Sequence, residues 1–264
     1  MKPFGFIYFV AATFCVSHAI AKPISFTEVR IPTRQNPVRL DLYQPNDPPS
    51  PGYGAASQKP HPTVLLLYGA GGLAFDGSRM RVTAQRLVGA GYKVYLLHYL
   101  DQTGEFMAGR SSMRRYFNEW VETVRYAIAW IQKQPSSSAP IGIYAYSLGG
   151  FIALEAASDN PQVGAVVDFA GGWVEGDMKP LGRMPPLLLV NGQRDRWVPY
   201  KKYVQPLFSH LEQHNIAYES RVFPKQGHKF KPAELEDVRT QAIEFFRQHL
   251  KPAVSATALS QRSR

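Results

Sequence analysis

The chain has 264 residues, of which 45% are hydrophobic and 19% are charged, a composition that excludes an intrinsically disordered protein. Its formal net charge is +10, but the basic residues are dispersed and form no run with interleaved aromatic residues, so we expect no nucleic-acid partner. The histidines are scattered, and the glycine-rich segments lack the lysine and the spacing of a phosphate-binding loop. We therefore expect no metal and no other cofactor.

The amino terminus has the three parts of a secretory signal peptide over residues 1–21. Lys2 precedes an apolar stretch at residues 4–16, and an A-x-A cleavage site follows at residues 19–21. Cleavage there removes Cys15, the only cysteine of the chain. We predict an exported protein, periplasmic or secreted, without stable membrane insertion after cleavage. Retention of this segment as a membrane anchor is the alternative.

The rest of the sequence predicts one α/β domain over residues 22–251, followed by a disordered tail at 252–264. Two β-type segments, near residues 24–31 and 38–43, precede a linker at 44–62 that is rich in proline, glycine and serine. Helical segments, of which residues 114–134 have the clearest apolar stripe, then separate strands near residues 63–68, 92–98, 140–146, 163–169, 186–191 and 217–223. This alternation favours a mostly parallel central sheet with helices on both faces.

The strand near residues 140–146 runs into a serine surrounded by small residues. Residues 145–149, Ala-Tyr-Ser-Leu-Gly, fit the G-x-S-x-G nucleophile elbow with alanine in place of the first glycine. In an elbow the serine lies on a strained strand-to-helix turn, and its neighbours are small because the two backbones nearly touch. A glycine-rich turn into a buried helix gives the same pattern without catalysis, so Ser147 needs partners elsewhere in the chain.

Two residues downstream could be those partners, because each comes just after a predicted strand. The order Ser147, Asp195, His228 is the chain order of an α/β-hydrolase triad. Loops that follow parallel strands gather at one edge of the sheet, where the three side chains could meet. Asp195 alone could instead be a turn residue or a helix N-cap, and Asp168, at the end of an earlier strand, is the rival acid.

The strand near residues 63–68 leads into a glycine-rich loop, Tyr-Gly-Ala-Gly-Gly at residues 68–72. Together with the three triad residues, this loop resembles a dienelactone-hydrolase-type α/β-hydrolase, from about Val64 through the last helix. The resemblance implies the α/β-hydrolase fold and an oxyanion hole in this loop. Asp195 lies 48 positions after Ser147, which leaves no room for a large cap domain. The chain has serine where the family's namesake has its cysteine nucleophile, so we expect a serine variant of the family.

These residues predict a serine hydrolase that cleaves a carboxylic ester or a lactone of a small-molecule substrate. His228 would accept the proton of Ser147, Asp195 would orient the imidazole, and the backbone N–H groups of Leu148 and Ala70 would form the oxyanion hole. The residues expected to contact substrate are Tyr68, Gly69, His98 and Arg196. An acyl-peptidase or dipeptidyl peptidase of the prolyl-oligopeptidase type is one alternative, and a catalytically dead binding protein of the same fold is another.

Overall fold

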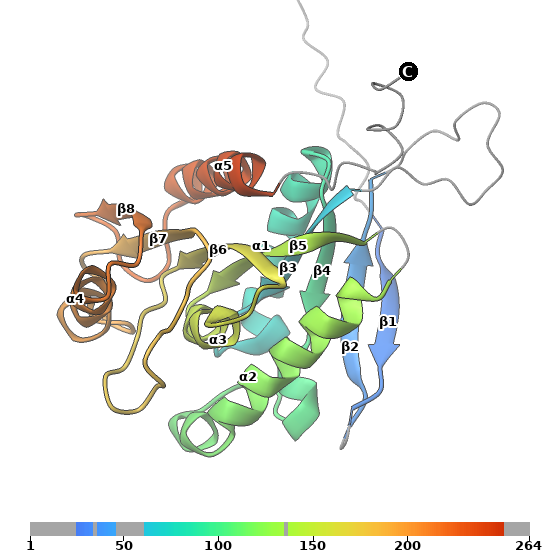
Figure 1. Ribbon diagram of the computed structural model, residues 1–264, viewed down its shortest axis with the longest axis horizontal. Coiled ribbons are helices and arrows are strands. Elements are labelled where there is room, and N and C mark those ends of the chain that lie inside the picture. Colours follow the sequence, from blue (N-terminus) through green and yellow to red (C-terminus); the bar gives the residue numbers. More distant parts are fainter. Residues whose placement is uncertain (1–24, 34–35, 46–60, 135–136, 251–264) are drawn as a thin grey trace, which may run out of the picture.

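The structure, a computed structural model, describes residues 25–33, 36–45, 61–134 and 137–250 (Figure 1). The predicted signal peptide, most of the predicted linker and the predicted tail lie outside these described residues. Within them, all eight predicted strands are present, and their ends differ from the predicted ones by a few residues. The strands are β1 Thr27–Ile31, β2 Val38–Tyr43, β3 His61–Leu67, β4 Lys93–Leu97, β5 Ser137–Tyr146, β6 Val163–Phe169, β7 Leu187–Gly192 and β8 Tyr218–Phe223.

The strands form one 8-stranded sheet in the order β1-β2-β4-β3-β5-β6-β7-β8. Strand β2 is antiparallel to both of its neighbours, whereas the six strands from β4 to β8 in this order are parallel. Every residue of β4 and of β7 is buried. A parallel sheet covered on both faces explains why these strands are continuous apolar runs rather than alternating ones. The predicted mostly parallel sheet is thus confirmed.

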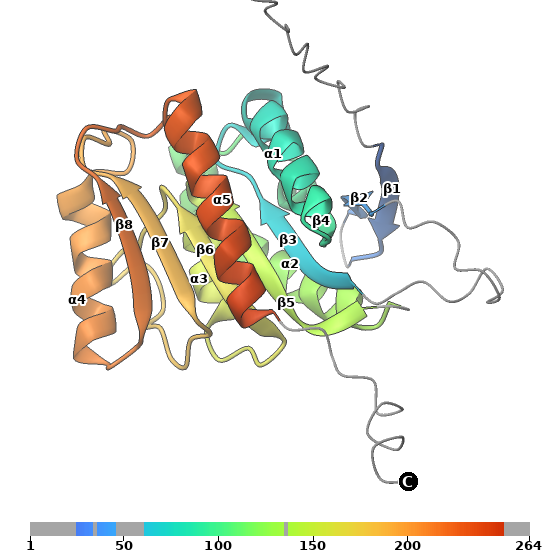
Figure 2. The same ribbon diagram turned by 90° about the horizontal axis from the view of Figure 1, so that it is seen from above.

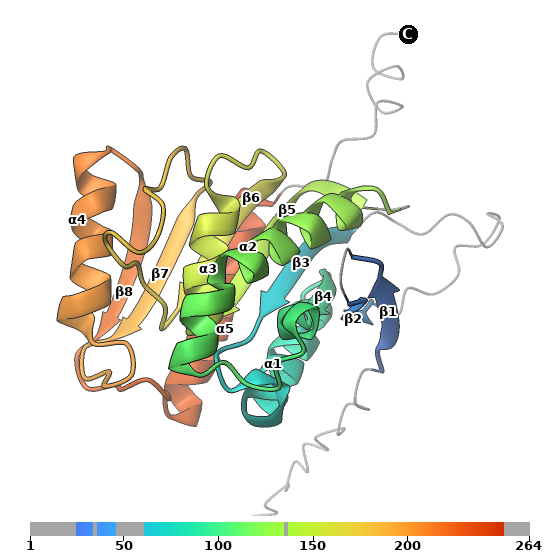
Figure 3. The same ribbon diagram turned by 90° about the horizontal axis from the view of Figure 1, so that it is seen from below.

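Five α-helices cover the two faces of this sheet: α1 Gly72–Gly89, α2 Arg110–Gln132, α3 Leu148–Ala157, α4 Gln205–Gln213 and α5 Pro232–His249. Helices α1 and α5 lie on one face (Figure 2), and α2, α3 and α4 lie on the other (Figure 3). A 3₁₀ turn, η1 at Tyr99–Thr103, and a π-helical turn, η2 at Tyr200–Val204, complete the described elements. None of the described helices is long and apolar enough to span a membrane.

Helix α2 begins four residues before the start predicted at residue 114. The backbone N–H of Gly109 donates to Ser112 Oγ at 2.9 Å, and Met113 N–H donates to the Gly109 carbonyl at 2.9 Å. These bonds satisfy polar groups of the first turn, which an apolar period cannot reveal because the turn is mostly polar. Further along, the fully buried Trp120 donates from Nε1 to Thr103 Oγ1 at 2.9 Å, which ties α2 to η1.

The carboxyl ends of the parallel strands lie at one edge of the sheet, so the loops after β3, β5, β7 and β8 meet there. The connection between β6 and β7, residues 170–186, contains no helix or strand. No cap domain is inserted at this point, in agreement with the short distance between Ser147 and Asp195 in the sequence. The site is therefore built from short loops on a rigid sheet.

Candidate active site

Ser147 lies at the sharp turn between β5 and α3 with a strained backbone. Its φ is 54° and its ψ is −121°, a region that residues other than glycine rarely adopt. The turn is held from both sides, because Ser147 N–H donates to the Phe169 carbonyl at 2.9 Å and Gly150 N–H donates to the Ser147 carbonyl at 2.8 Å. The strained turn projects the serine at the edge of the sheet instead of along the strand.

The small residues around Ser147 are required by close backbone contacts. A Cβ on Gly149 would lie 2.6 Å from the Tyr68 carbonyl oxygen, and one on Gly150 would collide with the carboxyl of Asp168. Helix α3 is buried on nearly all sides, so it has no freedom to move away. Ala145 is fully buried in β5, and the fold accommodates its methyl group at the position of the first glycine.

The side chains of Ser147, His228 and Asp195 form one hydrogen-bonded chain. Ser147 Oγ lies 2.8 Å from His228 Nε2, and His228 Nδ1 donates to Asp195 Oδ2 at 2.6 Å. All three residues are buried, and each keeps less than a tenth of its surface exposed. The second oxygen of Asp195, Oδ1, accepts the N–H groups of Trp197 and Val198, each at 2.8 Å. Asp195 is therefore a turn residue and a histidine partner at once, because its two oxygens serve different groups.

Close backbone contact between two loops brings Asp195 to His228. Arg194 N–H donates to the Gln226 carbonyl at 2.9 Å, and Gln193 N–H donates to the Phe223 carbonyl at 3.0 Å. A Cβ on Gly192 would lie 2.6 Å from the carbonyl oxygens of Gln226 and Gly227, so only glycine allows this approach. The loops after β7 and β8 are thus locked together.

The sequence of residues 51–250 matches the family described as the dienelactone hydrolase family. The chain belongs to the dienelactone hydrolase family. The predicted family is therefore confirmed, and the family is one of hydrolases. No curated protein sequence matches this chain.

Solved structures place the chain in the α/β-hydrolase fold. A dienelactone hydrolase from Anabaena variabilis is 24% identical with a TM-score of 0.67, covering 87% of this chain and 100% of that one. An esterase from Pyrococcus furiosus is 16% identical with a TM-score of 0.66, covering 86% and 94%. An acylaminoacyl peptidase from Pyrococcus horikoshii is 13% identical with a TM-score of 0.65, covering 89% of this chain and 43% of that one. These likenesses at low identity establish the fold.

In this dienelactone hydrolase family member His228 Nδ1 contacts Asp195 and not the rival acid, Asp168. Its side chain is fully buried against the backbone of Gly150 and Gly171. Burial raises the pKa of Asp168 to about 8, and a hydrogen bond from the Gly171 backbone opposes this shift only in part. A carboxyl group that is neutral at pH 7 cannot stabilise an imidazolium ion by its charge. Asp195 is the acid that the geometry supports.

The glycine-rich loop at residues 68–72 lies beside the serine, and three hydrogen bonds fix its backbone. Gly72 N–H donates to the Gly69 carbonyl at 3.1 Å, and Ala108 N–H donates to the Ala70 carbonyl at 2.8 Å. Gly69 N–H donates to Asp76 Oδ2 at 3.1 Å. A Cβ on Gly69 would lie 3.0 Å from the Ser147 Cβ, so the loop and the serine are in contact. Leu148 is the first residue of α3, and its N–H has no acceptor one turn earlier in the helix.

The residues expected to contact substrate have four different environments. Tyr68 is buried, its ring stacks on Tyr99 at 4.6 Å, and its hydroxyl accepts the Leu100 N–H at 3.4 Å, so it shapes the loop. His98 is also buried, with Nε2 3.0 Å from Asp41 Oδ1 on β2. In the sheet order β4 and β3 lie between β2 and β5, so this contact joins His98 to the strand on the far side of β4 from β5. Gly69 adjoins Ser147, and Arg196 is exposed beside Asp195.

Sequence reasoning missed two residues at this site, Asp76 and Trp197. Asp76 is buried on α1, and burial raises its pKa, with the nearby Arg79 opposing the shift. Nothing in the sequence distinguishes it from a surface residue of an amphipathic helix. Trp197 stacks on His228, with ring centres 5.5 Å apart and ring planes at 17°. Its position two residues after Asp195 was the only available signal.

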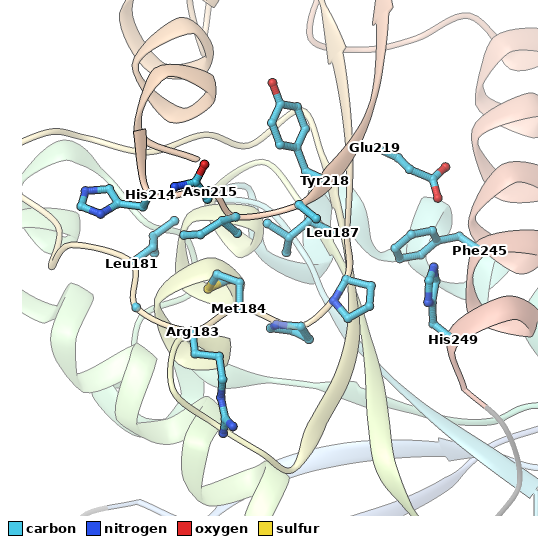
Figure 4. Close-up of a pocket in the computed structure, with 15 residues that line it drawn as sticks. Leu181, Arg183, Met184, Leu187, His214, Asn215, Tyr218, Glu219, Phe245 and His249 are labelled. Carbon is cyan, nitrogen blue, oxygen red and sulfur yellow. The ribbon is translucent and has the colours of Figure 1, made fainter. Parts of the chain in front are cut away.

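A groove of about 670 Å³ lies at a different place in the molecule (Figure 4). Leu187 and Tyr218, the first residues of β7 and β8, line it, so it opens at the edge where these strands begin. The triad residues follow strand ends at the opposite edge, and the groove is separate from them. Among the described residues, no three histidine, cysteine, aspartate or glutamate side chains are grouped so that they could hold a metal ion.

Proposed function

We propose that the protein is a serine hydrolase that cleaves a carboxylic ester or a lactone through an acyl-enzyme intermediate. The single observation that carries this proposal is the unbroken hydrogen-bonded chain from Ser147 Oγ through His228 to Asp195, on a strained elbow. Membership of a hydrolase family supports the same conclusion.

The first half of the reaction forms the acyl-enzyme. Ser147 Oγ attacks the carbonyl carbon of the ester while His228 Nε2 takes its proton, and Asp195 stabilises the resulting imidazolium. The carbonyl oxygen becomes an oxyanion, which the N–H groups of Leu148 and Ala70 would bind. Each such donor lowers the barrier by about 3 kcal/mol. The intermediate collapses as the bond from carbon to the alcohol oxygen breaks, and His228 gives its proton to the leaving alcohol.

The second half restores the serine. A water molecule gives a proton to His228 Nε2 and attacks the acyl carbon, so that a second tetrahedral intermediate forms. When the bond to Ser147 Oγ breaks, the proton returns from His228 to the serine and the carboxylic acid leaves. For a lactone the leaving alcohol stays attached to the acyl group, so one ring-opened hydroxy acid is the product.

A series of p-nitrophenyl esters of increasing acyl length tests this function, with the Ser147→Ala variant measured alongside. We expect turnover by the wild type and loss of turnover in the variant, with unchanged circular dichroism. The acyl length that is cleaved fastest gives the size of the acyl site. If the folded wild type cleaves no ester or lactone and a fluorophosphonate does not label Ser147, the proposal is wrong.

We further propose that the protein is exported and that residues 1–21 are removed on export. The apolar stretch behind Lys2 and the A-x-A site support this proposal. Expression of the full chain in a bacterium, followed by fractionation and amino-terminal sequencing, tests it. A mature chain that begins near Lys22 in the periplasm or medium is the expected result, and an intact amino terminus in the membrane fraction would favour the anchor.

A further inference from the structure

Trp197 has an unusual environment for a tryptophan, because it is 72% exposed next to the triad. Trp120 and Trp173 of the same chain are buried. A large aromatic side chain at the surface leaves apolar area in contact with water, which is unfavourable unless a ligand or partner covers it. The backbone at this residue is also fixed, since the backbone N–H of Trp197 donates to Asp195 Oδ1 at 2.8 Å. The turn that fixes the acid therefore also fixes the backbone of Trp197, and the ring contact with His228 places the indole.

The indole is the outer member of a row of three rings in contact, with the triad histidine in the middle. The Tyr146 ring lies 5.2 Å from the His228 ring, and the Trp197 ring lies 5.5 Å from it, nearly parallel at 17°. Tyr146 is buried, whereas Trp197 is at the surface end of the row. The indole is thus the part of the row that a bound molecule can reach.

The chemistry places the leaving alcohol beside this indole. In the proposed reaction His228 Nε2 gives a proton to the alcohol oxygen, which must lie within hydrogen-bond reach of that nitrogen. The group attached to this oxygen is then next to the ring that stacks on the imidazole. A flat aromatic group at this point can lie against the indole and cover apolar surface, which an aliphatic group does less well.

Two other exposed aromatic side chains near the site lie beside the glycine-rich loop. Phe75 and Phe106, both exposed, flank the glycine-rich loop, where a Cβ on Gly71 would contact Phe75 and one on Gly72 would collide with the Phe106 carbonyl. That loop would hold the carbonyl oxygen, not the leaving alcohol. Trp197 is the exposed ring that contacts the triad histidine.

We propose that Trp197 forms a leaving-group subsite and makes the enzyme prefer esters of aromatic alcohols. This inference rests on the proposed ester hydrolysis and names the class of alcohol that the enzyme releases. Lys229, whose Nζ lies 5.7 Å from the centre of the indole ring, is adjacent to this subsite. Trp197 acts on specificity through contact with the alcohol part of the substrate, and it transfers no proton itself.

The test compares two esters of one acid, a phenyl ester and an ester of a fluorinated aliphatic alcohol of similar acidity. Because the two alcohols have similar acidity, the ratio of the two kcat/KM values depends little on leaving-group reactivity. An effect of a substitution on His228 changes both values by the same factor and leaves the ratio unchanged. In Trp197→Ala we expect this ratio to fall about 10-fold, whereas Trp197→Phe, which keeps a ring, should retain most of it. Phe106→Ala, beside the glycine-rich loop, and Tyr126→Ala, an exposed ring on α2, are matched controls that should leave the ratio unchanged.

Equal loss for both esters in Trp197→Ala would mean that the indole only positions His228, and it would overturn the inference. A binding measurement separates this failure from a failure of the proposed function. Isothermal titration of Ser147→Ala with the phenyl ester, repeated in the Ser147→Ala, Trp197→Ala double variant, requires no turnover. We expect about 10-fold weaker binding in the double variant. Equal binding by the two proteins would overturn the subsite even if the wild type cleaves esters.

Discussion

Replacement of Asp168 with asparagine should remove a large part of the pH dependence of the protein's stability. Burial raises the pKa of Asp168 to about 8 in the folded protein, against 3.8 for the ordinary group. Between these two values the folded state keeps a proton that the unfolded state releases. The free energy of unfolding therefore decreases as pH rises, by about 1.4 kcal/mol per pH unit, and stays constant above pH 8 as far as this group is concerned.

The whole effect of Asp168 amounts to about 6 kcal/mol of stability lost between about pH 4 and about pH 8. Asparagine has the same shape and an oxygen that can still accept the Gly171 hydrogen bond, but it does not ionise. The free energy of unfolding of Asp168→Asn should therefore increase relative to that of the wild type, by up to about 6 kcal/mol, as pH rises through this range.

Urea denaturation followed by circular dichroism at several pH values between about 4.5 and 9 measures this difference. Asp177→Asn, which removes an exposed carboxyl group, is a control that should keep the wild-type pH dependence. Parallel pH profiles for wild type and Asp168→Asn would show that burial does not hold the proton on Asp168, and would refute the reasoning. At pH 7 the variant should also keep its ester hydrolysis, since the group that it replaces is already neutral there.

Three further substitutions test the site. Asp195→Asn should lower kcat by about 10³-fold or more with little loss of folding, because the imidazolium loses its negative partner; near-full activity would return the acid role to Asp168. Gly149→Ala should destabilise the protein by about 1–3 kcal/mol in thermal unfolding, because its Cβ would meet the Tyr68 carbonyl oxygen, whereas Gly89→Ala, with open space around it, should not. Asp76→Ala removes the acceptor of the Gly69 N–H and should lower kcat about 10-fold with little change in KM; a rise in KM at constant kcat would mean that Asp76 affects binding rather than the oxyanion loop.

The sequence alone determined the strands, the family and the chain order of the triad. Strands such as β7 could be found because a parallel sheet is buried on both faces, so each strand is an unbroken apolar run with a loop behind it. The elbow could be found because strand and helix nearly touch at Ser147, and only small residues fit there. Both patterns involve residues that are neighbours in the chain, so they can be recognised in the sequence without the structure.

Only the tertiary structure decided how the neighbouring side chains are used. The choice between Asp195 and Asp168 depends on burial and on which carboxyl reaches His228 Nδ1, and both aspartates follow apolar strands in the same way. The partner of His98 is Asp41, which lies on the antiparallel strand β2 and more than 50 positions earlier in the chain. Asp76 and Trp197 reach the site through a helix and a turn whose packing no residue pattern records. Hydrogen bonds and ring contacts between distant segments exist only after the chain has folded, so a linear sequence supplies the candidates and the fold selects among them.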